Sequence, residues 1–118
     1  MQYLLMIYGN EAGMAAAPAE GIKQMNSAYE AYTKALINAG ALKGGDRLRP
    51  TSEATTVRLK DGKAQVLDGP YADTKEQLAG YYLIDVPDLD TALAWAAKIP
   101  SVGYGSVEVR PIMVFDQA

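Results

Sequence analysis

Hydrophobic and polar residues follow two different periods along this chain, and together they predict strands and helices. Short apolar runs at residues 3–8 and 80–86 are typical of buried strands. Between about residues 20 and 39, apolar side chains recur at spacings of three and four, which predicts an amphipathic helix. Gly40 follows this helix and is suited to the left-handed residue that ends it.

The C-terminal third of the chain predicts one more amphipathic helix and one more strand. A second amphipathic helix is expected over residues 89–99, with Asp88 as its N-cap and Pro100 just after its end. Alternating apolar and charged side chains over residues 105–115 predict a last strand. Pro111 cannot donate a backbone hydrogen bond, so this strand should lie at a sheet edge or carry a bulge.

The middle of the chain predicts a hairpin. Alternating segments at residues 55–60 and 63–67 flank Asp61-Gly62, a two-residue turn signal. A short strand is expected at residues 42–48. Residues 11–19 are expected to form a loop, and the Asp-x-x-Glu spacing over residues 73–76 predicts a short helical turn that begins with a capping box.

The resulting order is strand, helix, strand, hairpin, strand, helix, strand. This order predicts one α+β domain over residues 1–118, a ferredoxin-like β-α-β-β-α-β unit with an added hairpin. Two helices can cover only one face of such a sheet. The first strand is nevertheless apolar on both faces, with Tyr3, Leu5 and Ile7 on one side and Leu4, Met6 and Tyr8 on the other. We therefore expect a homodimer that covers the second face, with any small-molecule cavity between the sheet and its partner or at the sheet's rim.

Composition removes several classes of chemistry. The 118 residues include no histidine and no cysteine, which excludes imidazole bases, thiolate nucleophiles, disulfides and zinc ribbons. A net charge of −3 argues against a generic nucleic-acid binder, because such proteins present a basic face. No cofactor motif is found. The apolar run at residues 1–8 is short and has no basic residues before it, so we do not expect it to be a signal peptide. No stretch approaches about 20 apolar residues, and a cytoplasmic protein without membrane contact is expected.

Several segments resemble a known family. The sequence DGPYADTKEQLAGYYLIDVPDLDTALAWAAKIP, Asp68 to Pro100, is similar to the signature of the DGPF subgroup of the YCII-related family. The segments YLLMIYG, ALKGGDRLRP and GSVEVRPI, beginning at Tyr3, Ala41 and Gly105, also resemble it. Tyr71 stands where the name-giving motif has phenylalanine.

The resemblance implies a dimeric α+β barrel and says less about activity. Some YCII-like proteins have been proposed to be enzymes because they carry a His-Asp pair in a cleft. Asp68 matches the acidic half of that pair, but this chain has no histidine to complete it. The DGPF subgroup is also associated with extracytoplasmic-function sigma factors, which implies a regulatory setting.

Four residues are candidate site residues, each with a simpler alternative. Asp68 is the candidate catalytic base or ligand anchor, but Asp-Gly-Pro also favours an Asx turn. Tyr71 and Tyr82 are candidate ligand-binding residues, and both could equally serve packing. Arg110 could clamp an anion or form a cross-strand ion pair. Arg47 and Arg49 could line the entry of an anionic ligand, with a solvated sheet edge as the alternative.

These observations support two functions. The first is a homodimer that binds a small polar or anionic metabolite in a cavity near the Asp68-Gly69-Pro70-Tyr71 motif, with a lyase or isomerase activity as one option. The second is a non-enzymatic regulatory or interaction module associated with sigma-factor signalling. Without histidine or cysteine, any catalysis would rest on Asp68 with support from tyrosine or arginine.

Overall fold

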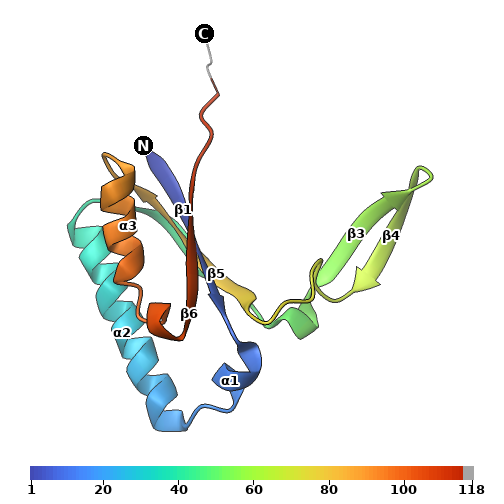
Figure 1. The fold of residues 1–118 in the computed structure, drawn as a ribbon, viewed down its shortest axis with the longest axis horizontal. Helices are drawn as coiled ribbons and strands as arrows, with labels where there is room; N and C mark the ends of the chain where they lie inside the picture. The colour runs from blue at the N-terminus through green and yellow to red at the C-terminus, as the bar shows by residue number, and fades with distance from the viewer. Residues whose placement is uncertain (116–118) are drawn as a thin grey trace.

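The computed structural model describes residues 1–115 and contains a four-stranded sheet, helices packed against it, and a hairpin that stands apart (Figure 1). The strands of the sheet are β1 (Gln2–Gly9), β2 (Leu42–Arg47), β5 (Gln77–Asp85) and β6 (Gly105–Pro111), in the spatial order β2-β5-β1-β6. Neighbouring strands are antiparallel, so β1 and β2 run parallel with β5 between them. This split β-α-β arrangement confirms the prediction of a ferredoxin-like α+β fold.

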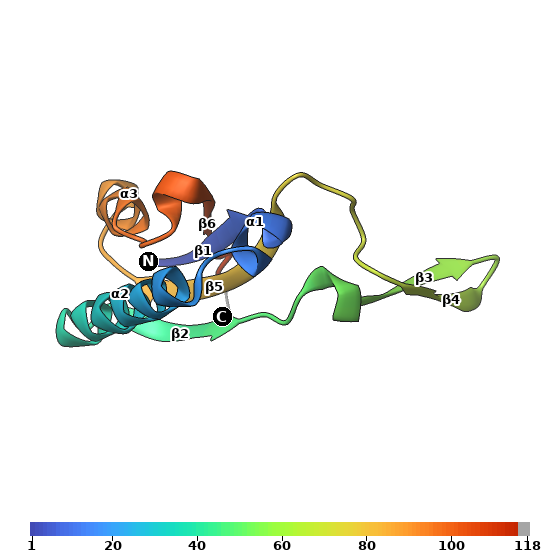
Figure 2. The same cartoon turned by 90° about the horizontal axis from the view of Figure 1, so that it is seen from below.

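Two helices, α2 (Ala19–Asn38) and α3 (Leu89–Ala97), lie on the same side of the sheet (Figures 1 and 2). Their expected ends are confirmed: Gly40 has a φ of +71°, and Asp88 accepts a hydrogen bond of 2.8 Å from the Thr91 amide. No helix within residues 1–115 combines the length and the apolar character needed to cross a membrane.

The hydrophobic core lies between these helices and one face of the sheet. Alternate residues of β1 and β5 point into the core, and α2, α3 and the segments next to these helices pack against them. The buried side chains are Tyr3, Leu5, Ile7, Tyr32, Leu36, Ala41, Ile84, Val86, Ala92, Ala96 and Ile99. Hydrophobic burial on this face therefore accounts for the position of both helices.

The opposite face of the sheet, which we call the open face, has no described helix over it. Leu4, Met6 and Tyr8 of β1 point to this side and are only half-buried. Strand pairing places Leu83 beside Leu4, and Tyr81 beside Met6, on the same face. The prediction that β1 is apolar on both faces is confirmed, and one of these faces is open.

Residues 55–68 form a separate two-stranded sheet, which we call the arm. It consists of β3 (Thr55–Lys60) and β4 (Lys63–Asp68), joined through Asp61 and Gly62 with φ angles of +52° and +77°. The hairpin prediction is confirmed, because two consecutive positive φ angles are what a tight hairpin turn requires. In both views the arm projects on the side of the main sheet away from the helices (Figures 1 and 2).

Three local predictions are wrong. Residues 11–15 form a short helix, α1, and not a loop, because the Asn10 side chain caps it by accepting a hydrogen bond of 2.7 Å from the Gly13 amide. Residues 73–76 are not helical; the Thr74 hydroxyl donates to the Glu76 carbonyl, the side-chain amide of Gln77 donates to the Thr74 carbonyl, and β5 begins at Gln77. The last strand ends at Pro111, four residues earlier than expected, and it lies at a sheet edge as its proline indicated.

Candidate functional site

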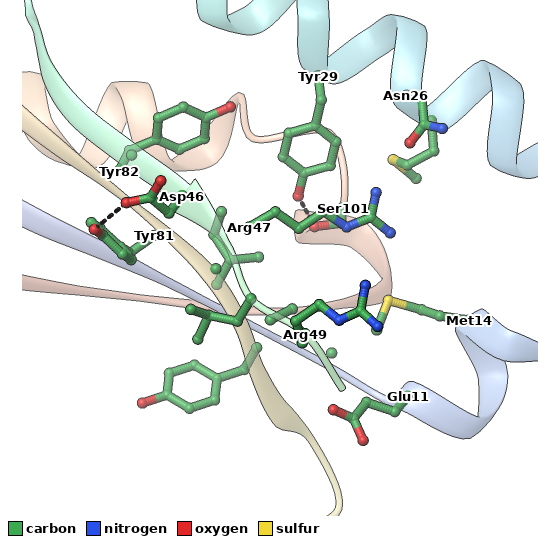
Figure 3. Close-up of a pocket in the computed structure, with 18 of the residues that line it drawn as sticks. Glu11, Met14, Asn26, Tyr29, Asp46, Arg47, Arg49, Tyr81, Tyr82 and Ser101 are labelled. Atoms are coloured by element: carbon green, nitrogen blue, oxygen red, sulfur yellow. Dashed lines mark hydrogen bonds between the residues drawn. The ribbon is translucent and has the colours of Figure 1, made fainter. Parts of the chain in front are cut away.

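A cleft of about 1180 Å³ lies between the middle of α2 and the strands β2 and β5 (Figure 3). Helix α1 (Glu11–Ala15) closes one end of it, and the 3-10 turn η2 (Val102–Tyr104) lies close by with Ser101 just before it. The cleft therefore lies between the two layers of the fold and borders the hydrophobic core, since Ile7, Tyr29 and Tyr82 line the cleft and belong to the core or pack against it.

Two glycines shape the floor of the cleft. In the pairing of β2 with β5, Gly45 lies beside Tyr82 and Arg47 lies beside Gly80. A Cβ atom at Gly80 would come within 2.8 Å of the Asp46 carbonyl oxygen, so only glycine fits there without a shift of the backbone. Because Gly80 has no side chain, the surface next to Arg47 stays hollow.

Arg47 has no ionic partner among the residues that the structure describes, and no other described contact holds its guanidinium, in contrast to the other three arginines. Arg49 pairs with Glu53 at 3.0 Å, and Arg110 pairs with Glu108. Arg58 lies over the ring of Tyr71, 5.2 Å from its centroid. Arg47 instead extends along the cleft towards Tyr29 and Ser101 (Figure 3). An unpaired guanidinium in a cleft is suited to bind an anion through two parallel hydrogen bonds.

Four hydroxyl groups also line the cleft, from α2, β5 and the segment just before η2. Tyr29 and Ser101 share a hydrogen bond of 2.5 Å, and Thr33 and Tyr82 share one of 2.8 Å. Burial raises the pKa of the Tyr29 phenol, while its hydrogen bond with Ser101 acts in the opposite direction. The phenol is therefore a neutral hydrogen-bonding group at neutral pH and not a base.

The end of the cleft formed by α1 carries the Glu11 carboxylate, which already accepts hydrogen bonds from within the chain. Glu11, the first residue of α1, accepts hydrogen bonds from the Thr51 amide at 2.9 Å and from the Thr51 hydroxyl at 2.6 Å. Both carboxylate oxygens are thus engaged in holding residue 51 against α1. Asp46, at the opposite edge, accepts a hydrogen bond of 2.6 Å from Tyr81, which raises the pKa of that phenol.

Much of the remaining cleft wall is apolar. Met14 of α1 and Met25 of α2 line it together with Ile7 and Leu42, and the polar Asn26 and the ion-paired Arg49 also line it. Methionine adapts its shape to irregular ligands and makes favourable contacts with aromatic rings. One guanidinium without an acidic partner (Arg47), several neutral hydroxyls and apolar side chains together suit a small anion that carries an apolar body.

A second, smaller cavity of about 300 Å³ lies beside the Asp68-Gly69-Pro70-Tyr71 motif. Pro70 and Tyr71 form one side of it, and Tyr8 and Leu78 form another. Tyr8 also lines the larger cleft, so the two cavities are neighbours. The Tyr71 side chain is 78% exposed, so most of its ring faces solvent.

The four candidate site residues are not brought together within one chain. Tyr82 lines the larger cleft, and Tyr71 lines the smaller cavity. Arg110 pairs with Leu4 of β1 and so points to the open face, where its ion-pair partner is Glu108 of its own strand and not a residue across the sheet. Asp68 ends β4 opposite Thr55, exposed and outside both cavities.

The alternative interpretation of Asp68, an Asx turn, has no support in the hydrogen bonds of residues 1–115. The Gly69 amide donates to the Ala54 carbonyl at 2.8 Å, and the Thr56 hydroxyl donates to the Gly69 carbonyl at 2.8 Å. None of the described groups donates a hydrogen bond to the Asp68 carboxylate. Asp68 therefore has neither a ligand-site environment nor a turn role inside its own chain.

Sequence reasoning missed most of the cleft. Arg47 is exposed on the edge strand β2, as the solvated-edge alternative expects, and it also lines the cleft; a single sequence does not show that Gly80 lies beside it. Tyr29 and Thr33 are four residues apart on α2 and thus share a helix face, which is the signal that could have paired them. Ser101 follows the end of α3 and carries no sequence signal of its own.

Within residues 1–115, no group of three or more acidic, histidine or cysteine residues is arranged to hold a metal ion.

Comparison with known proteins agrees with this architecture. The YCII-related domain matches residues 1–116, almost the entire chain. The chain belongs to the YCII-related family. A relative of this YCII-related protein, an uncharacterised protein of Rhizobium meliloti (strain 1021), is 38% identical over 117 residues, which cover 98% of this chain and 94% of the relative. The family resemblance predicted from the sequence is confirmed, while membership of the DGPF subgroup stays a prediction.

Proposed function

We propose that this YCII-related protein binds a small anionic molecule with an apolar body in the cleft between α2 and the strands β2 and β5. The observation that carries the proposal is Arg47, which lines the cleft and has no acidic partner among the described residues. Tyr82 and Tyr29 supply hydroxyls in the same cleft, and Met14 and Met25 supply the apolar wall. The ligand's anionic group lies on Arg47 and its apolar part lies against the methionines.

The first prediction tests this cleft. Purified protein is titrated with a panel of small carboxylates and phosphate monoesters that carry aromatic or branched apolar groups, and binding is followed by NMR. Arg47→Gln is expected to raise the Kd of the best ligand about tenfold or more, because it removes a charge-assisted pair of hydrogen bonds.

Arg110→Gln is the matched variant, since Arg110 is the sequence-predicted anion ligand and lies on the opposite face of the sheet. We expect it to leave the Kd unchanged. A loss of binding in Arg110→Gln with no effect of Arg47→Gln would move the site to the open face. A panel without any saturable binder would contradict the proposal.

The proposal includes a homodimer in which the open faces of two copies pack together. Half-buried Leu4, Met6 and Leu83 on the open face support it, because soluble proteins seldom leave such a face in water. A twofold axis would bring the same apolar strip of each copy into contact.

A cytoplasmic location and the absence of a nucleic-acid partner stay predictions.

Catalysis by Asp68 is a further part of the proposal and depends on the second copy. Asp68 is exposed and lies outside both cavities of its own chain, so a role as a base requires surroundings from another subunit. Turnover of a bound ligand by the purified protein, lost in Asp68→Asn with binding intact, would support a lyase or isomerase. Binding without turnover leaves a ligand-binding protein.

The sigma-factor association implied by the family resemblance is an alternative function and not the preferred one. Co-purification with a sigma factor, together with failure of every small anion to bind, would favour that regulatory alternative.

A further inference from the structure

The arm, residues 55–68, exposes an apolar face to solvent. Residues paired across β3 and β4 share a face, and alternate pairs lie on the same side. One face therefore carries Val57 with Val66 and Leu59 with Ala64. Val57, Leu59 and Val66 are 62%, 76% and 67% exposed, and none of them belongs to the hydrophobic core.

The other face of the arm is mostly polar. It carries Arg58 opposite Gln65 and Lys60 opposite Lys63, with Thr56 opposite the exposed Leu67 at its base. Such a division between faces is typical of a sheet with one side packed and one side in water. A two-stranded hairpin is marginally stable alone, so a hairpin of this kind needs a surface to pack against.

The position of the arm indicates where that surface is. The helices lie on one side of the main sheet and the arm projects on the other side, the side of the open face (Figures 1 and 2). A second copy packed on the open face would therefore lie beside the arm. The arm and the open face are two unpaired apolar surfaces on the same side of one chain.

We propose that the arm is an intersubunit clasp: its apolar face packs on a second copy of this chain and places Asp68 at the interface between the two subunits. Asp68 pairs with Thr55 two positions before the Val57–Val66 pair, so it lies on the same face of the arm. This inference rests on the homodimer of the proposed function, and it gives Asp68 the surroundings that its own chain lacks.

Interface area supports a contribution from the arm. A face of seven-residue strands, four across, spans about 450 Å² in projection, and a face of the arm adds about 200 Å². A stable dimer buries about 800 Å² of accessible surface per partner. The open face of the sheet alone offers less area than this, and the face of the arm supplies much of the remaining area.

Because the chain has no cysteine, single thiols provide a direct test. Ala64 and Gln65 are adjacent, exposed and on opposite faces of the arm. At protein concentrations where sedimentation shows a dimer, Ala64→Cys should react with a maleimide at least tenfold more slowly than Gln65→Cys. Dilution to the monomer should remove the difference between the two rates.

A second pair of variants measures the energy of the contact. Val66→Asp is expected to raise the dimer dissociation constant at least tenfold, whereas Gln65→Asp should change it less than twofold. Circular dichroism should show the same fold for both, since neither residue contacts the core.

Equal thiol reactivity in a proven dimer, or a dimer constant unaffected by Val66→Asp, would overturn the clasp and leave a dimer formed by the open faces alone. A wild-type protein that is monomeric at every concentration would overturn the clasp together with the dimer. The titrations of the Arg47 cleft report separately on ligand binding in either case.

Discussion

Arg47 and Arg49 are close in sequence, but only Arg49 has an acidic partner among the described residues. Arg49 lies two positions after Arg47 and pairs with Glu53 four residues further on, a pairing that sequence spacing favours. The open surface beside Arg47 depends on Gly80, which lies 33 positions away in sequence and pairs with Arg47 in the sheet. Local pattern therefore accounts for Arg49, whereas the function proposed for Arg47 depends on a contact that only the fold reveals.

Asp88 is a charged residue whose role could be predicted from sequence alone, and it gives a pH-dependent prediction. Its hydrogen bonds with Thr91 lower the pKa of the Asp88 carboxyl in the folded protein. The stabilisation is therefore fully present above the unfolded-state pKa of about 4 and is lost as the pH falls through the lower folded-state pKa.

Asp88→Ser keeps a capping hydroxyl and removes the titration. In urea unfolding experiments between pH 2 and pH 6, wild-type stability should fall more steeply at the acid end than that of the serine variant. Identical slopes in the two proteins would contradict the role assigned to Asp88.

At the scale of the elements, local rules succeeded where one segment decides its own structure. The Asp61-Gly62 turn and the Asp88 cap were predicted because each needs only neighbouring residues. The capping box expected at residues 73–76 failed, because this segment leads into β5 and its side chains bond to nearby carbonyls instead. The cap at Asn10 was overlooked because the short α1 lacks an apolar stripe.

The pairing of β6 with β1 gives a prediction at the same scale. Gly105, at the start of β6, lies so close to β1 that a Cβ atom would be 2.1 Å from the Tyr8 carbonyl oxygen. Gly105→Ala should therefore lower the free energy of unfolding by about 1–3 kcal/mol, as overpacking typically does.

Gly103→Ala is the matched control, since nothing lies within 4 Å of the position of its Cβ atom. Denaturant unfolding should show little change for this variant. If Gly105→Ala were as stable as Gly103→Ala, the close approach of β6 to β1 would not hold in solution.

At the scale of the molecule, the sequence predicted the fold and one open apolar face, but it did not predict the geometry of the cleft. The alternating residues of β1 were sufficient to show that both faces of the sheet are apolar. The cleft depends on how α2 and α1 diverge from the sheet, which involves contacts such as Glu11 with Thr51 across 40 positions. Such contacts leave no pattern in a single sequence.

The open face gives the prediction for the assembly. Met6 is half-buried at the centre of this face, between Tyr81 of β5 and Glu108 of β6. Met6→Asp should weaken the homodimer by about tenfold or more in analytical ultracentrifugation, because it places a charge in the apolar contact. Gln24→Asp, an exposed position on α2, adds the same charge and should leave the dimer constant unchanged. Equal behaviour of the two variants would exclude the open face as the interface.

The separation of the arm from the core has a consequence for the newly made chain. The contacts of the main sheet and its helices form within one molecule, so the time they take does not depend on concentration. Nothing described within the same chain covers Val57, Leu59 and Val66, and any cover from a second molecule must wait for an encounter. During that interval the arm is an exposed β-ribbon, the kind of segment on which aggregation begins. The lysines at its tip, Lys60 and Lys63, act as charged gatekeepers during this period.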